Sequence, residues 1–112
     1  TMAKPLVERA ETELPGVVVS TETAKLEFAK SKKNLLIIVD THIKSFVESP
    51  DLLSMSKMTI VIDHHRKAVD YIDDAVIFFH DPSASSASEL VTELIEYIPA
   101  VDETGTLFFV SA

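Results

Sequence analysis

The residues best suited to chemistry in this sequence are carboxylates and imidazoles that directly follow apolar runs. They form three groups, which are Asp40 with His42, Asp63 with His64 and His65, and His80 with Asp81. Carboxylate oxygens and imidazole nitrogens bind divalent metals, and a bound metal can lower the pKa of a water molecule towards neutrality. Because the chain has no Cys to supply thiolates, the donor set favours harder ions, with Mn²⁺ as the first expectation.

Each group also has a simpler interpretation. Asp63, His64 and His65 could be a solvated polar strand end, and Asp40 could cap a turn. Two adjacent histidines on an extended segment point in opposite directions. We therefore expect one of them to bind a metal while its neighbour faces a substrate or a supporting residue. His42 and His80 receive no role here beyond that of improvised ligands.

The apolar runs before these groups read as buried strands. Residues 35–39, 58–65 and 75–81 are the three expected strands, and helices are expected to begin at Ser49-Pro50 and after Ser86. Strands that alternate with helices predict an α/β fold with a three-layer, Rossmann-like parallel sheet. Sites in such sheets lie beyond the carboxyl ends of the strands, so the three groups should meet at one edge.

Several smaller elements can be predicted as well. Residues 3–13 favour a helix, residues 17–19 a short strand, and Ser20 or Thr21 the cap of a helix that carries Ala24, Phe28 and Ala29. Ser86 and Glu89 have the spacing of a capping box. The helix that follows them should present residues 87, 90, 91, 94, 95 and 98 on one face and close at Pro99.

Composition narrows the function classes. The 112 residues suit one domain, and 46% hydrophobic with 25% charged residues is ordinary for a globular chain. A net charge of -8 argues against gripping duplex nucleic acid. Two glycines cannot form a glycine-rich phosphate loop. No run approaches the roughly 20 apolar residues of a spanning helix, and no secretory signal is visible.

A phosphate could nevertheless be held near the serine-rich stretch. Ser86 and Ser88 would lie at a helix N-terminus, which favours anions, and Arg66 could supply a cation. The simpler interpretation is that Ser86 only caps the helix and that Arg66 is a solvated turn residue.

Three motifs together resemble the DHH phosphoesterase family. They are "VDTH" at 39–42, "VIDHHRK" at 61–67 and "DPSASSASELVTELI" at 81–95, and they are most similar to membrane-anchored cyclic-di-AMP phosphodiesterases. The resemblance implies a two-metal site, usually Mn²⁺, that hydrolyses phosphodiester or phosphoanhydride bonds. It implies Asp40 as the bridging metal ligand and His64 as a ligand of one metal. His65 would contact the substrate phosphate, and Asp63 would support the histidines.

The family's first metal motif, its last metal aspartate and its glycine-rich substrate-binding domain are not found. We therefore expect residues 1–112 to be a single partial DHH domain, inactive when isolated, from a bacterial protein anchored in the cell membrane with its catalytic domain in the cytoplasm. An exposed sheet edge could drive homodimer formation. The substrate would be a cyclic dinucleotide or a short oligonucleotide. Alternatives are a RecJ-type exonuclease, an oligoribonuclease, a manganese pyrophosphatase, or a non-catalytic regulatory or oligomerisation module.

Overall fold

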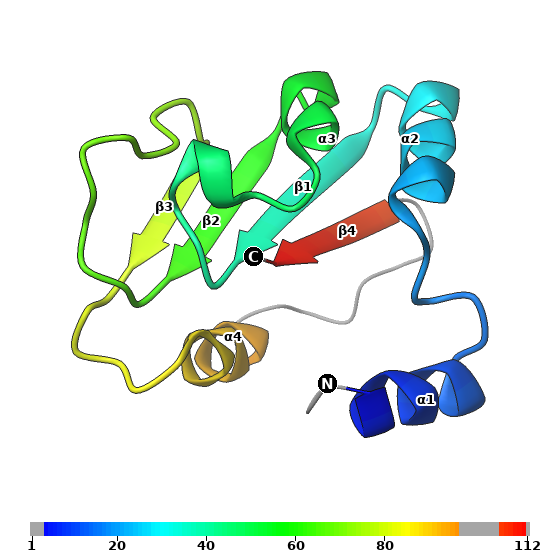
Figure 1. Cartoon of the computed structure of the whole chain (residues 1–112), viewed down its shortest axis with the longest axis horizontal. Coiled ribbons are helices and arrows are strands. Elements are labelled where there is room, and N and C mark those ends of the chain that lie inside the picture. The colour runs from blue at the N-terminus through cyan, green and yellow to red at the C-terminus, as the bar shows by residue number, and fades with distance from the viewer. Residues whose placement is uncertain (1–3, 97–105, 112) are drawn as a thin grey trace.

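The computed structural model describes residues 4–96 and 106–111, and Figure 1 shows its elements in order. In chain order these are α1 (Lys4–Glu13), α2 (Thr21–Lys30), β1 (Asn34–Val39), the 3-10 helix η1 (Lys44–Phe46), α3 (Pro50–Met55), β2 (Thr59–Asp63), β3 (Ile77–His80), α4 (Ala87–Ile95) and β4 (Thr106–Ser111). The expected closing residue Pro99 lies outside the described residues, as does Ile98.

The four strands form one parallel sheet in the order β3-β2-β1-β4. β1 lies inside the sheet, with Leu36 opposite Thr59 of β2 on one side and opposite Phe108 of β4 on the other. A strand that is covered on both faces needs apolar side chains in succession, and the run at residues 35–39 meets that need. The predicted α/β parallel sheet is confirmed.

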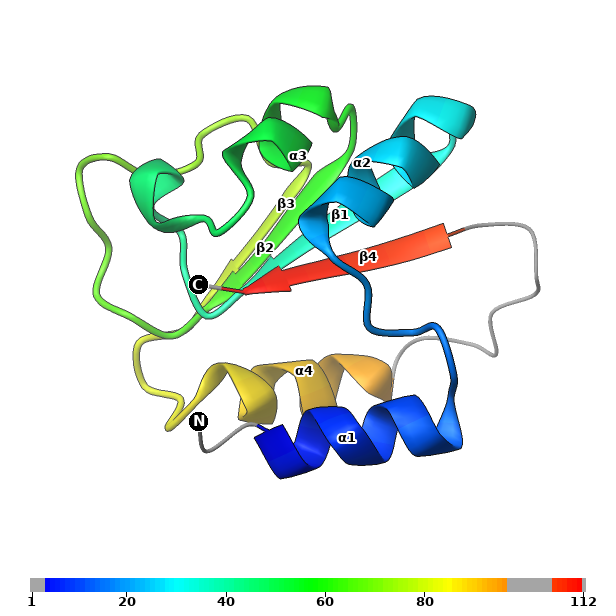
Figure 2. The ribbon, with the colours of Figure 1, turned by 45° about the vertical axis from the view of Figure 1, so that its right-hand side comes forward.

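Helices cover both faces of this sheet, which gives three layers (Figure 1). Leu36 and Ile38 point to the side of α2 and α3, where they join a core with Phe28 and Leu52. Ile37 points to the other side and packs in a cluster with Ile62 of β2 and Leu90 of α4. Figure 2 shows α1 on the same side as α4, although α1 buries none of its residues. Leu36, Ile38 and Leu90 are at most 1% exposed, so the sheet anchors both cores.

Most predicted elements form, but the strand predicted at residues 17–19 was wrong. Val17, Val18 and Val19 lie in an exposed connection between α1 and α2. The N–H of Val18 donates to the Glu11 carboxylate at 3.1 Å, so it takes no part in a strand ladder. β-branched residues favour strands only where a neighbouring strand and a buried face exist, and these valines have neither.

The helix starts follow their capping signals with one exception. Ser20 caps α2, and its hydroxyl accepts the Thr23 N–H at 3.2 Å. Ser86 caps α4, and its hydroxyl accepts the Glu89 N–H at 3.2 Å. Ser49 lies at the N-cap of α3 with Pro50 following, as predicted, but its hydroxyl bonds to that of Thr21 at 2.9 Å. Ser49 thereby links α3 to α2.

None of the helices in the described part of the chain has the length and apolar character needed to cross a membrane.

Candidate metal centre

The carboxyl ends of β1, β2 and β3 deliver their polar residues to the same edge of the sheet, as predicted. Asp40 follows β1, Asp63 ends β2 and His80 ends β3. From β1 the chain proceeds to β2 and β3 on one side, whereas β4 pairs on the other side. The strand order therefore reverses at β1, and ligands of open α/β sheets bind beyond the carboxyl ends at such a reversal. Asp40 stands at that point.

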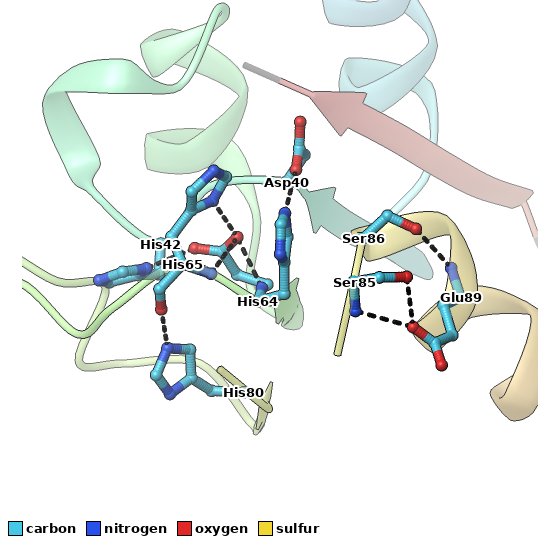
Figure 3. Close-up of polar contacts among 9 residues, drawn as sticks. Asp40, His42, His64, His65, His80, Ser85, Ser86 and Glu89 are labelled. Atoms are coloured by element: carbon cyan, nitrogen blue, oxygen red, sulfur yellow. Dashed lines mark hydrogen bonds and ion pairs between the residues drawn. The ribbon is translucent and has the colours of Figure 1, made fainter. Parts of the chain in front are cut away.

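Asp40 has a backbone conformation unusual for its residue type. Its φ is 68°, and it is the one non-glycine position with positive φ in the described ranges. Its N–H still donates to the Ile62 carbonyl at 3.0 Å, so it remains tied to β2 while the chain turns. Its Oδ1 lies 3.4 Å from His64 Nε2 (Figure 3). Two potential metal-ligand atoms, one from the segment after β1 and one from the segment after β2, are thus held close together.

Asp63 is fully buried and both of its carboxylate oxygens accept hydrogen bonds. Oδ1 accepts from the backbone N–H groups of His64 at 2.8 Å and His65 at 3.3 Å, and from His65 Nδ1 at 2.7 Å. Oδ2 accepts from His42 Nδ1 at 2.5 Å. Burial by itself raises the pKa of a carboxyl group, but the hydrogen bonds from His42, His65 and the backbone outweigh burial and lower the pKa of Asp63. Asp63 is therefore an anion that organises its neighbours.

His64 and His65 lie together, and the prediction that they point in opposite directions was wrong. Their ring centroids are 4.4 Å apart. β2 ends at Asp63, and the next two backbone N–H groups turn towards the Asp63 carboxylate. The alternation of side chains holds only for extended backbone, which ends before His64.

A group of four residues could hold a metal ion here. Each of Asp40, Asp63, His64 and His65 offers a ligand atom, and these atoms all lie within 4.8 Å of one another. Asp63 already accepts from protein donors at both oxygens. His65 donates from Nδ1, which leaves its Nε2 for another partner. The carboxylate of Asp40 and the imidazoles of His64 and His65 fit a divalent ion of the oxygen- and nitrogen-binding type.

His42 is close to this group and is excluded as a metal ligand by its hydrogen bonds. The Ala68 N–H donates to His42 Nε2 at 2.8 Å, so this nitrogen carries no proton and its lone pair is used. The proton therefore sits on Nδ1, which donates to Asp63. His80 donates from Nε2 to the His65 carbonyl (Figure 3), and Asp81 accepts from Ser83. His42 and His80, which were considered as improvised ligands, therefore have partners within the protein, and so does Asp81.

The serine candidates share a hollow with Asp40, whereas Arg66 is not part of its lining. Ser86 and Ser88 line an open hollow of about 510 Å³ together with Val39, Asp40 and Val91. Arg66 is exposed and is not part of this lining. Within the described ranges, no hydrogen bond or ion pair of its guanidinium is found.

The α4 N-terminus already carries a carboxylate. Glu89 accepts the N–H and the hydroxyl of Ser85, both at 2.8 Å. The capping box thus forms with its second bond displaced by one residue from Ser86 to Ser85 (Figure 3). An anion bound at this helix end would meet the negative charge of Glu89, which disfavours a phosphate directly on the helix axis.

Comparison with known proteins agrees with this geometry. Residues 3–108 match the N-terminal domain of the DHH family, and the chain therefore belongs to the DHH family. It is 35% identical over 96 residues to the cyclic-di-AMP phosphodiesterase PdeA of Listeria monocytogenes. This match covers 85% of the chain and 15% of PdeA.

Two further relatives carry the same activity in their names. The cyclic-di-AMP phosphodiesterases GdpP of Geobacillus thermodenitrificans and Bacillus subtilis are 46% and 48% identical over 69 and 65 residues. These matches cover 62% and 58% of this chain, and 10% of each relative. The chain thus spans a small part of the curated relatives that it matches.

Sequence reasoning found the residues around the centre but missed the contact between His42 and Ala68. No residue type signals a backbone N–H as a partner. The one available signal was the position of His42 in the segment after β1, two residues beyond Asp40.

Proposed function

We propose that this chain is the part of a metal-dependent phosphodiesterase that carries Asp40 and the Asp63-His64-His65 turn, and that the complete enzyme hydrolyses cyclic-di-AMP to the linear dinucleotide. The observation that supports this most is the approach of Asp40 Oδ1 to His64 Nε2, 3.4 Å apart at the point where the strand order reverses. Membership of the DHH family supports phosphoester hydrolysis, and the names of the relatives support the cyclic dinucleotide.

In this proposal Asp40 and His64 hold the metal, for which Mn²⁺ is the first candidate. A bound divalent ion supplies a water of lowered pKa and neutralises charge on the phosphoryl group. His65 faces the substrate phosphate through Nε2, because Asp63 fixes the proton of this imidazole on Nδ1. Asp63 remains an anion in the core and orients the imidazole of His65 and the backbone of His64.

Three residues are proposed as contacts for the substrate phosphate, and the structure supports Ser86 and Ser88 more directly than Arg66. Ser86 and Ser88 lie in the hollow beside Asp40, where their hydroxyls can contact a substrate bound at the metal. Arg66 does not line that hollow, and only the positive charge of its guanidinium supports it as a phosphate contact. We further propose, on the basis of the resemblance alone, a membrane-anchored bacterial parent with a cytoplasmic catalytic domain. The homodimer is proposed because an exposed sheet edge can pair with a second copy.

The test is hydrolysis by the full-length protein with Mn²⁺ and three substrates, namely cyclic-di-AMP, a short RNA and pyrophosphate. We expect cyclic-di-AMP to be preferred and turnover to be abolished in Asp40→Ala and His64→Ala. Asp70→Ala, at an exposed position in the same loop region, serves as the control and should retain activity. Undiminished turnover in both site variants would contradict the proposal. A preference for RNA or pyrophosphate would assign the same scaffold to an exonuclease, an oligoribonuclease or a pyrophosphatase.

A further inference from the structure

We propose that His42 is a positioning residue that fixes the turn carrying His64 and His65 in the geometry needed for metal and phosphate contact. The inference rests on the proposed function, because that function gives His64 and His65 their roles. It assigns a task to a buried histidine that neither binds the metal nor touches the substrate.

The imidazole of His42 is enclosed by the fold. Its residue is 1% exposed, and its ring meets Phe78 and His80 edge to face, with ring centroids 6.0 Å and 5.3 Å apart. A buried polar ring must satisfy its hydrogen-bonding groups within the protein. Both nitrogens of His42 do so.

The ring joins the two ends of the turn. Nδ1 donates to the carboxylate of Asp63 at the start, at 2.5 Å. Nε2 accepts the N–H of Ala68 at the end, at 2.8 Å. The backbone carbonyl of His42 also accepts the N–H of Ile72 at 2.8 Å. His42, in the loop after β1, therefore holds the end of β2 at one place and the following loop at two.

This bridge requires a donor and an acceptor on one rigid group. Because Ala68 can only donate and the Asp63 carboxylate can only accept, His42 must be neutral with its proton on Nδ1. An apolar ring of similar size fills the space and makes neither bond. A glutamine side chain offers an amide N–H and a carbonyl oxygen and can restore both.

The effect of His42 reaches the candidate ligands through Asp63. The carboxylate of Asp63 is held by His42 at Oδ2, and its Oδ1 accepts from the backbone of His64 and from both the backbone and the ring of His65. Removal of His42 leaves Oδ2 buried without this donor and lets the carboxylate rotate. Residues that orient ligands in this way typically change metal affinity by about 10- to 100-fold.

The first experiment measures amide hydrogen exchange in the 112-residue chain without metal, for the wild type, His42→Phe and His42→Gln. In His42→Phe we expect protection of the His64 and His65 amides to fall at least about tenfold, and in His42→Gln we expect most of it to return. The amide of Leu36, which donates to the Met58 carbonyl within the sheet, is the internal reference. Unchanged protection of His64 and His65 in His42→Phe would overturn the inference.

A second pair of variants covers the case in which His42→Phe does not fold. Ala68→Pro removes the N–H that donates to His42 and leaves the buried side chains untouched. Val69→Pro is the matched control, because the Val69 side chain is fully exposed and no hydrogen bond of its N–H is found among the described residues. We expect loss of protection at His64 and His65 in Ala68→Pro only. Equal behaviour of the two proline variants would count against the bridge.

A third measurement separates this inference from the proposed function. Mn²⁺ affinity is measured for the same variants and for Leu52→Val, a core change in α3 that lowers stability away from the turn. We expect affinity to fall about tenfold in His42→Phe, to recover in His42→Gln, and to remain unchanged in Leu52→Val. If the wild-type chain binds no Mn²⁺, the proposed metal site fails, while the exchange data still decide the role of His42. If Leu52→Val loses as much affinity as His42→Phe, the role of His42 is merely structural.

Discussion

At the scale of single residues, Asp40 combines a candidate metal-binding side chain with an unfavourable backbone conformation. Its φ of 68° lies in the left-handed region, which costs an ordinary L-residue roughly 1–2 kcal/mol. Such conformations concentrate at functional sites, where the surrounding structure imposes them. Here the turn after β1 brings the carboxylate of Asp40 to 3.4 Å from His64, which follows β2.

This conformation predicts a conflict between stability and function at position 40. Asp40→Gly removes the backbone cost and Asp40→Ala retains it, so the glycine variant should be the more stable by about 1 kcal/mol in urea unfolding. Both variants should lose Mn²⁺ binding, because both lack the carboxylate.

The control is the same pair at Asp70, which has an ordinary negative φ. At position 70 the alanine variant should be the more stable of the two, because glycine gains more conformational entropy on unfolding. Equal stability of Asp40→Gly and Asp40→Ala would show that the turn after β1 is not strained.

At the scale of elements, the start of α4 fixes how this helix presents its serines to the hollow beside Asp40. Ser86 accepts the N–H of Glu89 at 3.2 Å, which satisfies one of the unpaired donors of the first turn. We expect Ser86→Ala to lower the free energy of unfolding by about 1 kcal/mol. Ser88→Ala, two residues further along the chain and exposed, should change the free energy of unfolding by less than about 0.5 kcal/mol. Equal losses in urea unfolding would mean that the cap bond of Ser86 contributes little.

The carboxylate of Glu89 gives the same helix end a pH dependence. The backbone N–H and the hydroxyl of Ser85 donate to Glu89 and lower its pKa below the ordinary value of 4.5. Because the pKa of Glu89 is lower in the folded state, its hydrogen bonds stabilise the fold fully at pH values above the pKa of the unfolded state. This stabilisation is lost as the pH falls through the pKa of the folded state. The contact should therefore open only below about pH 4.5.

An NMR titration of the Glu89 carboxyl group checks this prediction. Ser85→Ala removes the hydroxyl and keeps the backbone N–H, so the midpoint should rise part of the way towards the ordinary value. An unchanged midpoint in Ser85→Ala would rule out the hydroxyl contact.

The sequence predicts those elements whose local signals agree with their environment. The apolar run of β1 reads as a buried parallel strand because both faces meet a core, at Leu36 and Ile38 on one side and Ile37 on the other. The run at residues 17–19 has the same local signal without a neighbouring strand, so its prediction failed. Strand propensity describes the preference of a residue's own side chain. Whether a neighbouring strand is present depends on residues elsewhere in the chain.

At the scale of the whole molecule, the candidate metal centre offers few ligand atoms within the described residues. Three residues offer ligand atoms that are not already used by the fold, namely Asp40, His64 and His65. A two-metal reaction needs enough ligands to hold both ions a few ångströms apart. We therefore expect the 112-residue chain to hydrolyse cyclic-di-AMP far more slowly than the full-length protein, with Mn²⁺ present in both assays. Turnover within about tenfold, a difference of roughly 1.4 kcal/mol in barrier, would contradict this expectation.

The sequence also predicts much of the site, because parallel strands bring their carboxyl ends to one edge. This rule placed Asp40, Asp63 and His80 correctly. It could not supply the orientation of His64 and His65, which depends on where β2 ends. Nor could it supply the role that we propose for His42, because that role depends on a backbone N–H 26 positions away.

The pairing of β1 has a consequence for the order in which the chain folds. β1 pairs with β2, where Leu36 lies opposite Thr59, and with β4, where Asn34 lies opposite Thr106. Closing a short loop costs less entropy than closing a long one, and contacts distant in sequence form more slowly. The β1–β2 pair should therefore form first in a refolding reaction, with β4 docking later. Since Asp40, His42 and the turn after Asp63 all belong to the earlier unit, the metal centre should assemble before the sheet is complete.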